Sequence, residues 1–501
     1  MKGVKNMQNP GRFKRALSIL LTAVILLSCG LIPVYAQDTD ITVEPIEFNN
    51  PDFIRGMDVS SVISLENSGV VFRDESGKAQ DLFRILADHG VNYIRVRVWN
   101  DPYDSDGNGY GGGNNDVAKA AQIGKRAAKY GMKLLVDLHY SDFWADPSKQ
   151  TSPKAWKDMA LESRIAALKE YTTGSLDAIR SAGADIGMVQ IGNEINNGVA
   201  GVTDFGEIPK VLSAASAAVR AFDPSILIAV HFTNPEQTAT TKWRADWLDE
   251  NKVDYDVFSV SYYPYWHGSL TNLSQVLGYV ADKYGKYVMV AETSYANTLE
   301  DSDGHPNTVS HTANHTGDDL LWDFTPQGQA DEVRAVMNAV NSVGEKGLGV
   351  FYWEGAWITV GDTTGLDGDV YMSRLNENRA LWEKFGSGWA SSFSVEYDPD
   401  DAGKWYGGSA VDNQAFFKPD GTAVSSLWVF DRVKEEAYLI GDTDLDGEVS
   451  ILDATAVQRY LVDLVYLRPT AQKAADANRS GGIEILDATR IQRTIAGYHD
   501  E

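Results

Sequence analysis

The 501-residue chain has almost no cysteine and a deficit of positive charge. Its only cysteine is Cys29, which excludes an intramolecular disulfide and a cysteine-based metal site. Lysine and arginine together number 44 against 70 aspartate and glutamate residues, and the formal charge is −26. Because such a surface repels phosphate and anionic lipid, we do not expect nucleic acid as a partner. A neutral ligand or a cation suits this charge.

Long apolar runs are also missing, apart from one near the N-terminus. There a basic stretch leads into the apolar residues 16–27, and Ala36 completes a pattern typical of signal cleavage. We therefore predict an export signal over residues 1–36, a linker over 37–46, and a secreted, extracellular protein that is free of the membrane after cleavage. Lipid modification at Cys29 is an alternative that the sequence leaves open.

Short apolar, β-branched runs alternate with helical patterns over most of the remaining chain. The eight runs are 53–60, 93–99, 132–140, 186–194, 226–232, 257–264, 287–295 and 347–354. Strands that are apolar on both faces and alternate with helices form parallel sheets, and eight such units favour a closed (β/α)8 TIM barrel of the α/β class. No glycine-rich phosphate loop follows the first run, which argues against nucleotide binding.

Polar side chains stand where these predicted strands end. In a barrel such positions converge on one mouth, so Glu194 and Glu292 are expected to face each other across it. Two carboxyl groups across a cavity are what glycosidic bond cleavage requires. Asp58 also ends a strand, although a salt bridge explains it equally well. The other candidates for substrate binding are Arg97, His139, Trp144, Asn193, Tyr262 and Trp353.

Five segments resemble glycoside hydrolase family 53, a family of endo-β-1,4-galactanases on clan A barrels. They are RGMDVS (55–60), RVWNDP (97–102), DLHYSDFWADP (137–147), QIGNEI (190–195) and AETSY (291–295). The resemblance covers roughly residues 47–432 and implies a catalytic domain over that range. It also implies that the substrate is galactan, a neutral polysaccharide of pectin side chains.

By this resemblance, Glu194 is the general acid and base, Glu292 is the nucleophile, and the anomeric configuration is retained. Asn193 would bind the 2-hydroxyl next to the scissile bond. The positions that would orient the two carboxyls are Arg97, His139 and either Tyr262 or Tyr263. Two rival functions remain: another clan A endo-glycanase acting on mannan or β-glucan, and a non-catalytic galactan-binding protein.

The resemblance further implies a calcium site in the catalytic domain. Alternating polar residues after the seventh predicted strand would share it with two residues far along the chain. These expected ligands are Asp301, Asp303, His305, Asn307, Ser409 and Asp412. Oxygen ligands suit calcium, whereas histidine is an unusual partner for a hard cation. A polar loop without metal is the alternative.

A duplication with a period of 34 residues occupies the C-terminal part. Residues 442–460 read DTDLDGEVSILDATAVQRY and residues 476–494 read DANRSGGIEILDATRIQRT. Each copy places acidic or polar residues at the spacing of a calcium loop, with glycine at the sixth position. The expected ligands are Asp442, Asp444, Asp446, Glu448 and Asp453 in the first copy, and Asp476, Asn478, Ser480, Gly482 and Asp487 in the second.

This duplication resembles a type I dockerin, a small all-α module that binds the cohesins of a cellulosome scaffold. We assign it residues 440–501, after a linker over 433–439. The resemblance implies two calcium ions and a cohesin partner, which is chosen partly by Ile451-Leu452 and Ile485-Leu486. Because the two copies are nearly identical, we expect two alternative cohesin-binding orientations. The enzyme itself is expected to be a monomer.

Overall fold

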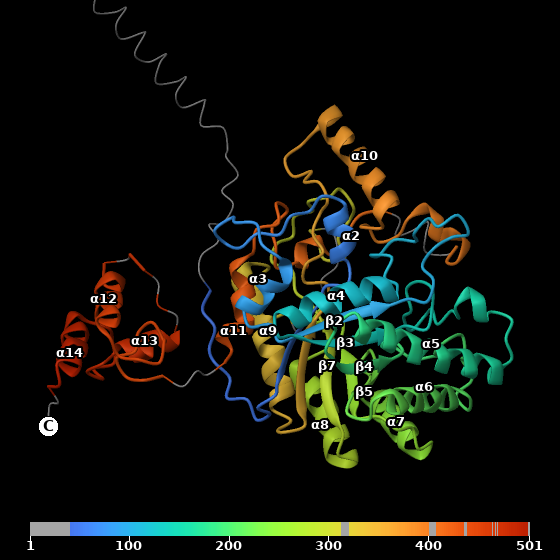
Figure 1. Cartoon of the computed structure of the whole chain (residues 1–501), viewed down its shortest axis with the longest axis horizontal. Coiled ribbons are helices and arrows are strands. Elements are labelled where there is room, and N and C mark those ends of the chain that lie inside the picture. The colour runs from blue at the N-terminus through green and yellow to red at the C-terminus, as the bar shows by residue number, and fades with distance from the viewer. Residues whose placement is uncertain are drawn as a thin grey trace, which may run out of the picture. The chain divides into compact units, whose positions relative to one another are not determined.

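The computed structural model describes residues 41–311, 320–399, 407–434, 438–462, 464, 465, 467 and 469–498. The predicted export signal, with Cys29, lies outside these residues. Two bodies are described separately below: a barrel built from residues 41–434 and a small helical body built from residues 438–498 (Figure 1). No helix in the described ranges combines the length and apolar character that a bilayer span needs.

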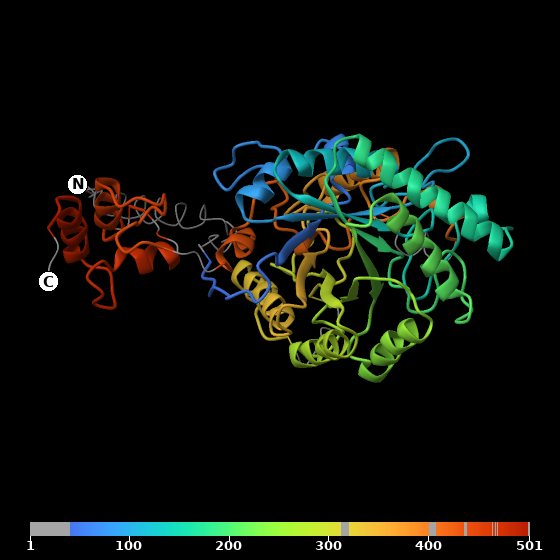
Figure 2. The same cartoon turned by 60° about the horizontal axis from the view of Figure 1, so that its bottom comes forward.

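The larger body is a closed barrel of eight parallel strands, as the alternation of runs predicts (Figure 2). Each strand pairs with the next, and β8 closes on β1 through the register of Ile54 with Gly349. The strands are β1 (Ile54–Asp58), β2 (Tyr93–Val98), β3 (Lys133–Leu138), β4 (Ile186–Ile191), β5 (Leu227–Phe232), β6 (Val257–Ser261), β7 (Tyr287–Thr293) and β8 (Gly347–Tyr352).

Helices follow the strands and surround the barrel. They are α2 (Val62–Asn67), α3 (Leu82–Asp88), α4 (Val117–Lys129), α5 (Leu161–Ser181), α6 (Ile208–Phe222), α7 (Thr238–Glu250), α8 (Leu270–Tyr284), α9 (Pro326–Asn341), α10 (Gly368–Phe385) and α11 (Val429–Arg432). Local chemistry sets their ends: Ser269 caps α8 by accepting from the Asn272 amide, and Gly285 ends it in the left-handed conformation.

The barrel interior is apolar at one end and polar at the other. Residues such as Leu135, Met188 and Met289 fill the apolar end. Gly56 is required there, because a Cβ at this position would lie 2.2 Å from the Phe351 ring. Side chains two residues apart on a strand share a face, so the polar residues Arg95 and Asp137 lie one layer nearer the mouth.

The closing segment that follows α10 packs on the barrel. Phe416, Phe417 and Phe430 are buried in the main core, and Thr422 pairs with Arg73 in a short parallel bridge. These contacts hold a segment that is distant in sequence beside the strand ends. Residues 400–406 of this segment lie outside the described residues.

The domain boundaries differ from those expected at both ends of the barrel. Ile41 and Val43, expected in a linker, are buried in the barrel core, and Ile46 pairs with Lys434. The short alternation of apolar and polar residues here is typical of a half-buried extended segment, but it is too brief to stand out in a sequence. Val433, also expected in a linker, is buried as well. We therefore propose residues 41–434 as the catalytic domain.

The small body contains α12 (Ile451–Tyr460), α13 (Pro469–Ala475) and α14 (Ile485–Ile495). Its core is made of small and aliphatic side chains, among them Ala454, Val457, Ala488 and Ile491. Both α12 and α14 begin with a capping box, in which the side chains at the first and fourth positions bond each other's backbone amides. The duplication in the sequence is therefore a duplication in structure.

Candidate active site

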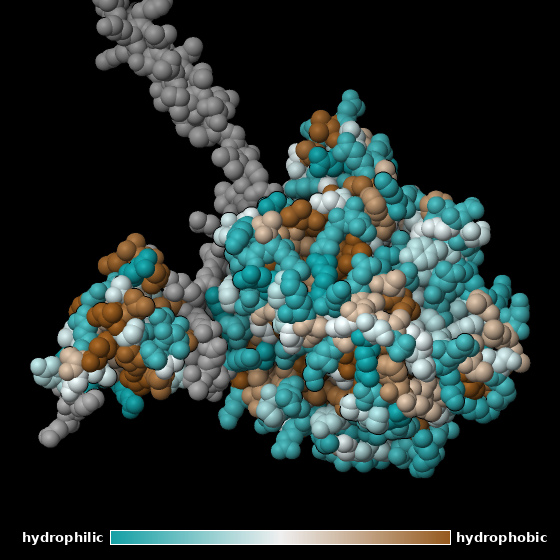
Figure 3. Space-filling model, in the orientation of Figure 1, coloured by the Kyte–Doolittle hydropathy of each residue, from teal (hydrophilic) through white to brown (hydrophobic). Residues whose placement is uncertain are grey.

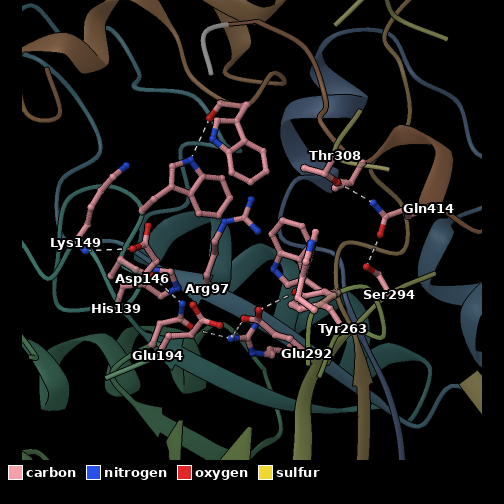
Figure 4. Close-up of a pocket in the computed structure, with 18 residues that line it drawn as sticks. Arg97, His139, Asp146, Lys149, Glu194, Tyr263, Glu292, Ser294, Thr308 and Gln414 are labelled. Atoms are coloured by element: carbon pink, nitrogen blue, oxygen red, sulfur yellow. Dashed lines mark hydrogen bonds and ion pairs between the residues drawn. The ribbon is translucent and has the colours of Figure 1, made fainter. Parts of the chain in front are cut away.

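A cleft of about 350 Å³ opens at the carboxyl ends of the strands. Glu194 follows β4 and Glu292 lies in β7, and both point into the floor of this cleft (Figure 4). The expected convergence of the two carboxyls is therefore present. The other lining residues include Arg95, Arg97, His139, Trp144, Asn193, Tyr263, Trp266, Trp353 and Trp389.

Glu292 is held by two donors. Arg95 on β2 contacts its Oε1 atom at 2.7 Å, and the Tyr263 hydroxyl donates to its Oε2 atom at 3.0 Å. Burial raises the pKa of Glu292, while the positive charge of Arg95 acts in the opposite direction. These two contacts stabilise the carboxylate form, which is the form that a nucleophile needs.

Arg95 is itself locked in place by carboxylates beneath the cleft. It makes ion pairs of 2.9 Å with both Asp58 and Asp137, and all three side chains are buried. It also donates to Asn193 Oδ1 at 3.0 Å. A guanidinium fixed on several sides can present one N–H to Glu292 without conformational freedom.

Glu194 has a contrasting environment. Its carboxyl is bonded to the Ser261 hydroxyl, with 2.6 Å between Oγ and Oε1, and no arginine or lysine pairs with it among the described residues. Burial and the nearby Glu292 raise the pKa of Glu194 to about 8. A carboxyl that stays protonated at neutral pH beside one that is held ionised can act as a general acid.

One hydroxyl reaches both carboxyls. Ser261 Oγ lies 2.6 Å from Glu194 Oε1 and 3.5 Å from Glu292 Oε2. Because both contacts share the Ser261 Oγ atom, the two carboxyl oxygens lie closer to each other than the roughly 6.5 Å at which the carboxyl separations of inverting glycosidases begin. The pair therefore fits a double displacement with retention, because no water molecule needs to fit between nucleophile and substrate.

Three of the expected binding residues have other positions. Arg97 does not contact Glu292; it pairs with Glu354 and lies 4.5 Å from the Trp144 ring centroid in the cleft wall. Arg95, one layer deeper on the same strand face, takes the predicted place. Asp58 is fully buried in its salt bridge with Arg95 and does not line the cleft.

Tyr262 does not line the cleft, contrary to the prediction. Its hydroxyl donates to the Gly268 carbonyl at 2.9 Å, and its side chain is 1% exposed. Consecutive residues of an extended segment point to opposite faces, so Tyr262 faces the outer core and Tyr263 faces the mouth. The sequence does not show which of the two adjacent tyrosines faces the cleft. Ser261 points into the barrel interior, so Tyr263, two residues later, lies on the same side.

His139 and Asn193 line the cleft as expected. His139 accepts from the Trp99 indole N–H at 3.1 Å through Nδ1, so its Nε2 carries the proton that bonds Asp137 at 2.9 Å. Asn193 donates to the Ala145 carbonyl at 2.8 Å. Both side chains are thus fixed in one orientation beside Glu194 and Glu292.

Tryptophans form one wall of the cleft. Trp144 stacks on Trp389 with 4.7 Å between ring centroids, and its indole donates to the Trp389 carbonyl at 3.1 Å. Trp353 completes this group, as expected. Flat apolar faces of this kind pack against the C–H groups of sugars. Trp389, which comes from the closing segment, and the half-exposed Trp266 also line the cleft, but neither stands at a strand end, so the strand-end pattern does not predict them.

Three of the six expected calcium ligands of the catalytic domain bring their carboxylates together, and the other three are hydrogen-bonded to those carboxylates. Carboxylate oxygens of Asp301, Asp303 and Asp412 lie within 4.8 Å of one another. Burial and mutual repulsion raise the pKa of Asp303 well above its usual range and that of Asp412 to about 6. His305 bonds Asp303 through its backbone amide at 2.7 Å, as does Ser409 at the same distance. Asn307 bonds Asp412 at 2.6 Å.

The two loops of the small body repeat one hydrogen-bond pattern. Asp442 accepts from the amides of the fifth and sixth loop positions at 3.1 and 3.0 Å, and Asp476 does the same at 2.8 Å in both bonds. Asp453 and Asp487 close the loops by accepting amides from both loop ends. Oxygens of Asp442, Asp444 and Asp453 lie within 4.8 Å of one another.

Known proteins resemble the chain in both parts. Residues 54–430 match the model of glycosyl hydrolase family 53, and residues 440–496 match that of the dockerin type I domain. The endo-beta-1,4-galactanase of Bacillus subtilis (strain 168) is 56% identical over 391 residues, covering 78% of this chain and 88% of the relative. An arabinogalactan endo-beta-1,4-galactanase of Cellvibrio japonicus (strain Ueda107) is 33% identical over 62% of this chain and 82% of its own length.

A solved structure agrees with this match. The catalytic domain of an Ignisphaera aggregans family 53 protein covers 79% of this chain and 100% of that domain, with a TM-score of 0.68 and 35% identity. A solved fungal β-1,4-galactanase covers 76% of this chain and 99% of its own, with a TM-score of 0.58 and 29% identity. With its barrel, its carboxyl pair and a family match over most of its length, this chain belongs to glycosyl hydrolase family 53 and carries a type I dockerin domain after the barrel.

Proposed function

We propose that the protein is an endo-acting, retaining hydrolase of β-1,4-galactan. The observation that carries this proposal is the pair of carboxyls in the mouth: Glu292 is held by Arg95 and Tyr263, and Glu194 is bonded to a neutral serine hydroxyl. The galactanase names of the Bacillus and Cellvibrio relatives support the choice of substrate. A neutral polysaccharide also suits an acidic chain.

In this proposal the two carboxyls exchange roles between two steps. Glu292 attacks the anomeric carbon while Glu194 gives its proton to the departing glycosidic oxygen, which leaves a covalent galactosyl enzyme. Glu194, now ionised, takes a proton from a water molecule that attacks the same carbon and releases Glu292. Arg95 and Tyr263 hold the nucleophile in line, and the tryptophan wall positions the sugar rings.

Hydrolysis of purified linear galactan tests the activity. An endo-acting enzyme should release mixed oligomers early, and each product should first appear with the β configuration in an NMR time course. Glu292→Gln should keep galactan binding but lower kcat by several orders of magnitude. Glu332→Gln is the matched control, because Glu332 is a buried carboxyl on α9 outside the cleft. Near-normal turnover by Glu292→Gln would reject the nucleophile assignment.

The same assay separates the rival functions. Release of reducing ends from mannan or β-glucan, with none from galactan, would indicate another clan A glycanase. Binding to galactan without any release would indicate a non-catalytic binding protein. A binding protein has no use for two carboxyls held in different protonation states, so the geometry favours the enzyme.

We also propose a structural calcium ion in the catalytic domain. The His305 amide bonds Asp303 and the Asn307 side chain bonds Asp412, while the buried atoms His305 Nε2 and Asn307 Oδ1 have no hydrogen-bond partner among the described residues. No lysine or arginine in the described ranges pairs with these carboxylates. A cation bound by Asp301, Asp303 and Asp412 would satisfy the unpaired atoms and neutralise the repulsion.

The dockerin domain extends the proposal to an assembly. We infer that it binds two calcium ions and a type I cohesin, and so attaches the enzyme to an extracellular cellulosome. Export through the predicted signal over residues 1–36 is part of this inference, and Cys29 lipidation is its alternative. The enzyme acts as a monomer on the scaffold. N-terminal sequencing of the secreted form would distinguish cleavage after Ala36 from lipid modification.

A further inference from the structure

Ser261 occupies a position that no part of the double displacement uses. It ends β6, is fully buried, and places its hydroxyl between the two catalytic carboxyls. On its other side, Oγ lies 2.9 Å from Nε2 of His231, which stands on β5 and is equally buried. A hydroxyl has one proton to donate and two lone pairs, so its bonding depends on what each neighbour carries.

The tautomer of His231 follows from the single proton of Ser261. Nδ1 of His231 lies 2.9 Å from Asn193 Oδ1, but two donors also face it: the Glu194 backbone amide at 3.4 Å and Gln190 Nε2 at 3.0 Å. Ser261 donates its only proton to Glu194 Oε1, so its Oγ can only accept from His231. His231 Nε2 therefore carries the proton of the ring, and Nδ1 accepts.

His231 is neutral in this environment. Burial and the positive charge of Arg95 lower its pKa well below the usual range, although Asp137 opposes them. A neutral imidazole carries one proton, so Nδ1 can only accept when Nε2 donates. The charged or titratable groups that face this network from the surrounding strands and loops are Arg95, Asp137, His139, Asp146, Glu194, Tyr263 and Glu292.

We propose that Ser261 is a positioning residue for both steps of the reaction, with His231 as its hydrogen-bond donor. The Ser261 hydroxyl donates to Glu194 Oε1, and His231 Nε2 donates to Ser261 Oγ. The proton that Glu194 gives to the leaving oxygen, and later takes from the attacking water, is therefore carried by its other oxygen, Oε2. The bond from Ser261 is kept while that proton leaves and returns. Glu194 thus keeps one orientation in both of its roles.

This inference rests on the proposed glycosidase function and is tested by a pH profile. Ser261→Ala should lower kcat about tenfold to a hundredfold and change KM less than about threefold, because it removes a hydrogen bond to a charged catalytic group. It should also shift the basic limb of kcat to higher pH, since the lost donor favoured the ionised form of Glu194.

The matched control is Ser259→Ala. Ser259 is a buried serine on the same strand, but its hydroxyl donates to the Val230 carbonyl at 2.8 Å. This variant should lose stability to a similar extent while its kcat and basic limb stay near those of the wild type. If the two alanine variants show the same profile, Ser261 has only a structural role and the proposal fails.

His231 is tested in two further ways. His231→Phe should lower kcat to a similar degree, and adding it to Ser261→Ala should cost little more, because both remove one hydrogen-bond chain. Additive losses would contradict the coupling. In the unaltered protein, ¹⁵N NMR should show His231 neutral with its proton on Nε2 from about pH 5 to 8. A doubly protonated ring, or a proton on Nδ1, would overturn the proposal even in a protein that does not hydrolyse galactan.

Discussion

At the scale of single residues, neighbours of the same type have different roles in this protein. Arg95 binds Glu292, the proposed nucleophile, whereas Arg97 supports the cleft wall, and Tyr263 faces the mouth whereas Tyr262 faces the core. In both pairs the residue types are identical, so composition and motif spacing cannot separate them. Depth along a strand separates the arginines, and the alternation of faces separates the tyrosines.

The two tyrosines allow a direct test of this separation. Tyr263→Phe should lower kcat/KM about tenfold to a hundredfold, because it removes a donor to the carboxylate of Glu292, the proposed nucleophile. Tyr262→Phe should leave kcat/KM within about threefold and lower stability by about 1 kcal/mol, since only a bond to the Gly268 carbonyl is lost. Steady-state kinetics and thermal melts measure both effects. An equal loss of activity in the two variants would contradict the assignment.

The raised pKa of Glu194 predicts the upper pH limit of activity. Glu194 must be protonated to act as the acid, so kcat/KM on galactan should persist through neutral pH and fall as the pH rises through about 8. A substrate whose leaving group needs no protonation should lack this fall in its glycosylation step. A decline centred near pH 5 would show that Glu194 does not hold its proton in the free enzyme.

The same pKa has a consequence for stability. The pKa of Glu194 in the folded protein lies above its ordinary value of 4.5, so the protonated carboxyl stabilises the folded state. This stabilisation is fully present below pH 4.5. This contribution is lost as the pH rises through about 8. Glu194→Gln should therefore melt at a higher temperature than the wild type at pH 9, and the difference should shrink toward pH 5. Melting curves at the two pH values test it.

At the scale of elements, loops from distant parts of the chain complete the barrel mouth. The loop after β7 meets the closing segment through Asp303 and the Ser409 amide, and the closing segment also supplies Trp389 to the cleft. The carboxylates at this junction repel each other unless a cation binds. The proposed calcium ion would therefore connect two segments beside the active site.

Calcium should reverse the stability order of the wild type and Asp303→Asn. Without calcium, the variant should be as stable as the wild type or more so, because one buried carboxylate is gone. With saturating calcium, the wild type should gain about 3 kcal/mol, as expected at roughly a hundredfold excess over Kd, and the variant should gain much less. Tryptophan fluorescence reports only the barrel, since residues 438–501 contain no tryptophan. An equal calcium response in both proteins would exclude this site.

At the scale of the whole molecule, the dockerin domain presents two equivalent apolar pairs. Ile451 and Leu452 are 56% and 62% exposed, and Ile485 and Leu486 are 58% and 56% exposed. Figure 3 shows hydrophobic atoms gathered on the surface of this small body. Exposed aliphatic side chains at matching positions of a duplicated unit indicate a binding surface that is itself duplicated.

Changing one pair should therefore leave cohesin binding largely intact. Ile451→Asp with Leu452→Asp should alter the Kd for a type I cohesin less than about fivefold, because the second pair can take its place by a half-turn of the domain. The same changes in both pairs should abolish binding. Calorimetric titration of the full chain measures each case. Complete loss of binding from the first pair alone would refute the two orientations.

The sequence by itself determined the eight-stranded barrel, the carboxyl pair and the duplicated calcium loops. These follow from local information: apolar periodicity, the residue at each strand end, and a repeated spacing of oxygen ligands. Only the tertiary structure decided that Arg95 and Tyr263 serve Glu292, that Asp58 is a buried counterion, and that Trp389 and residues 41–46 join the barrel. Layer depth in a closed barrel, and contacts between segments hundreds of residues apart, are properties of the packed chain, and no local pattern encodes them.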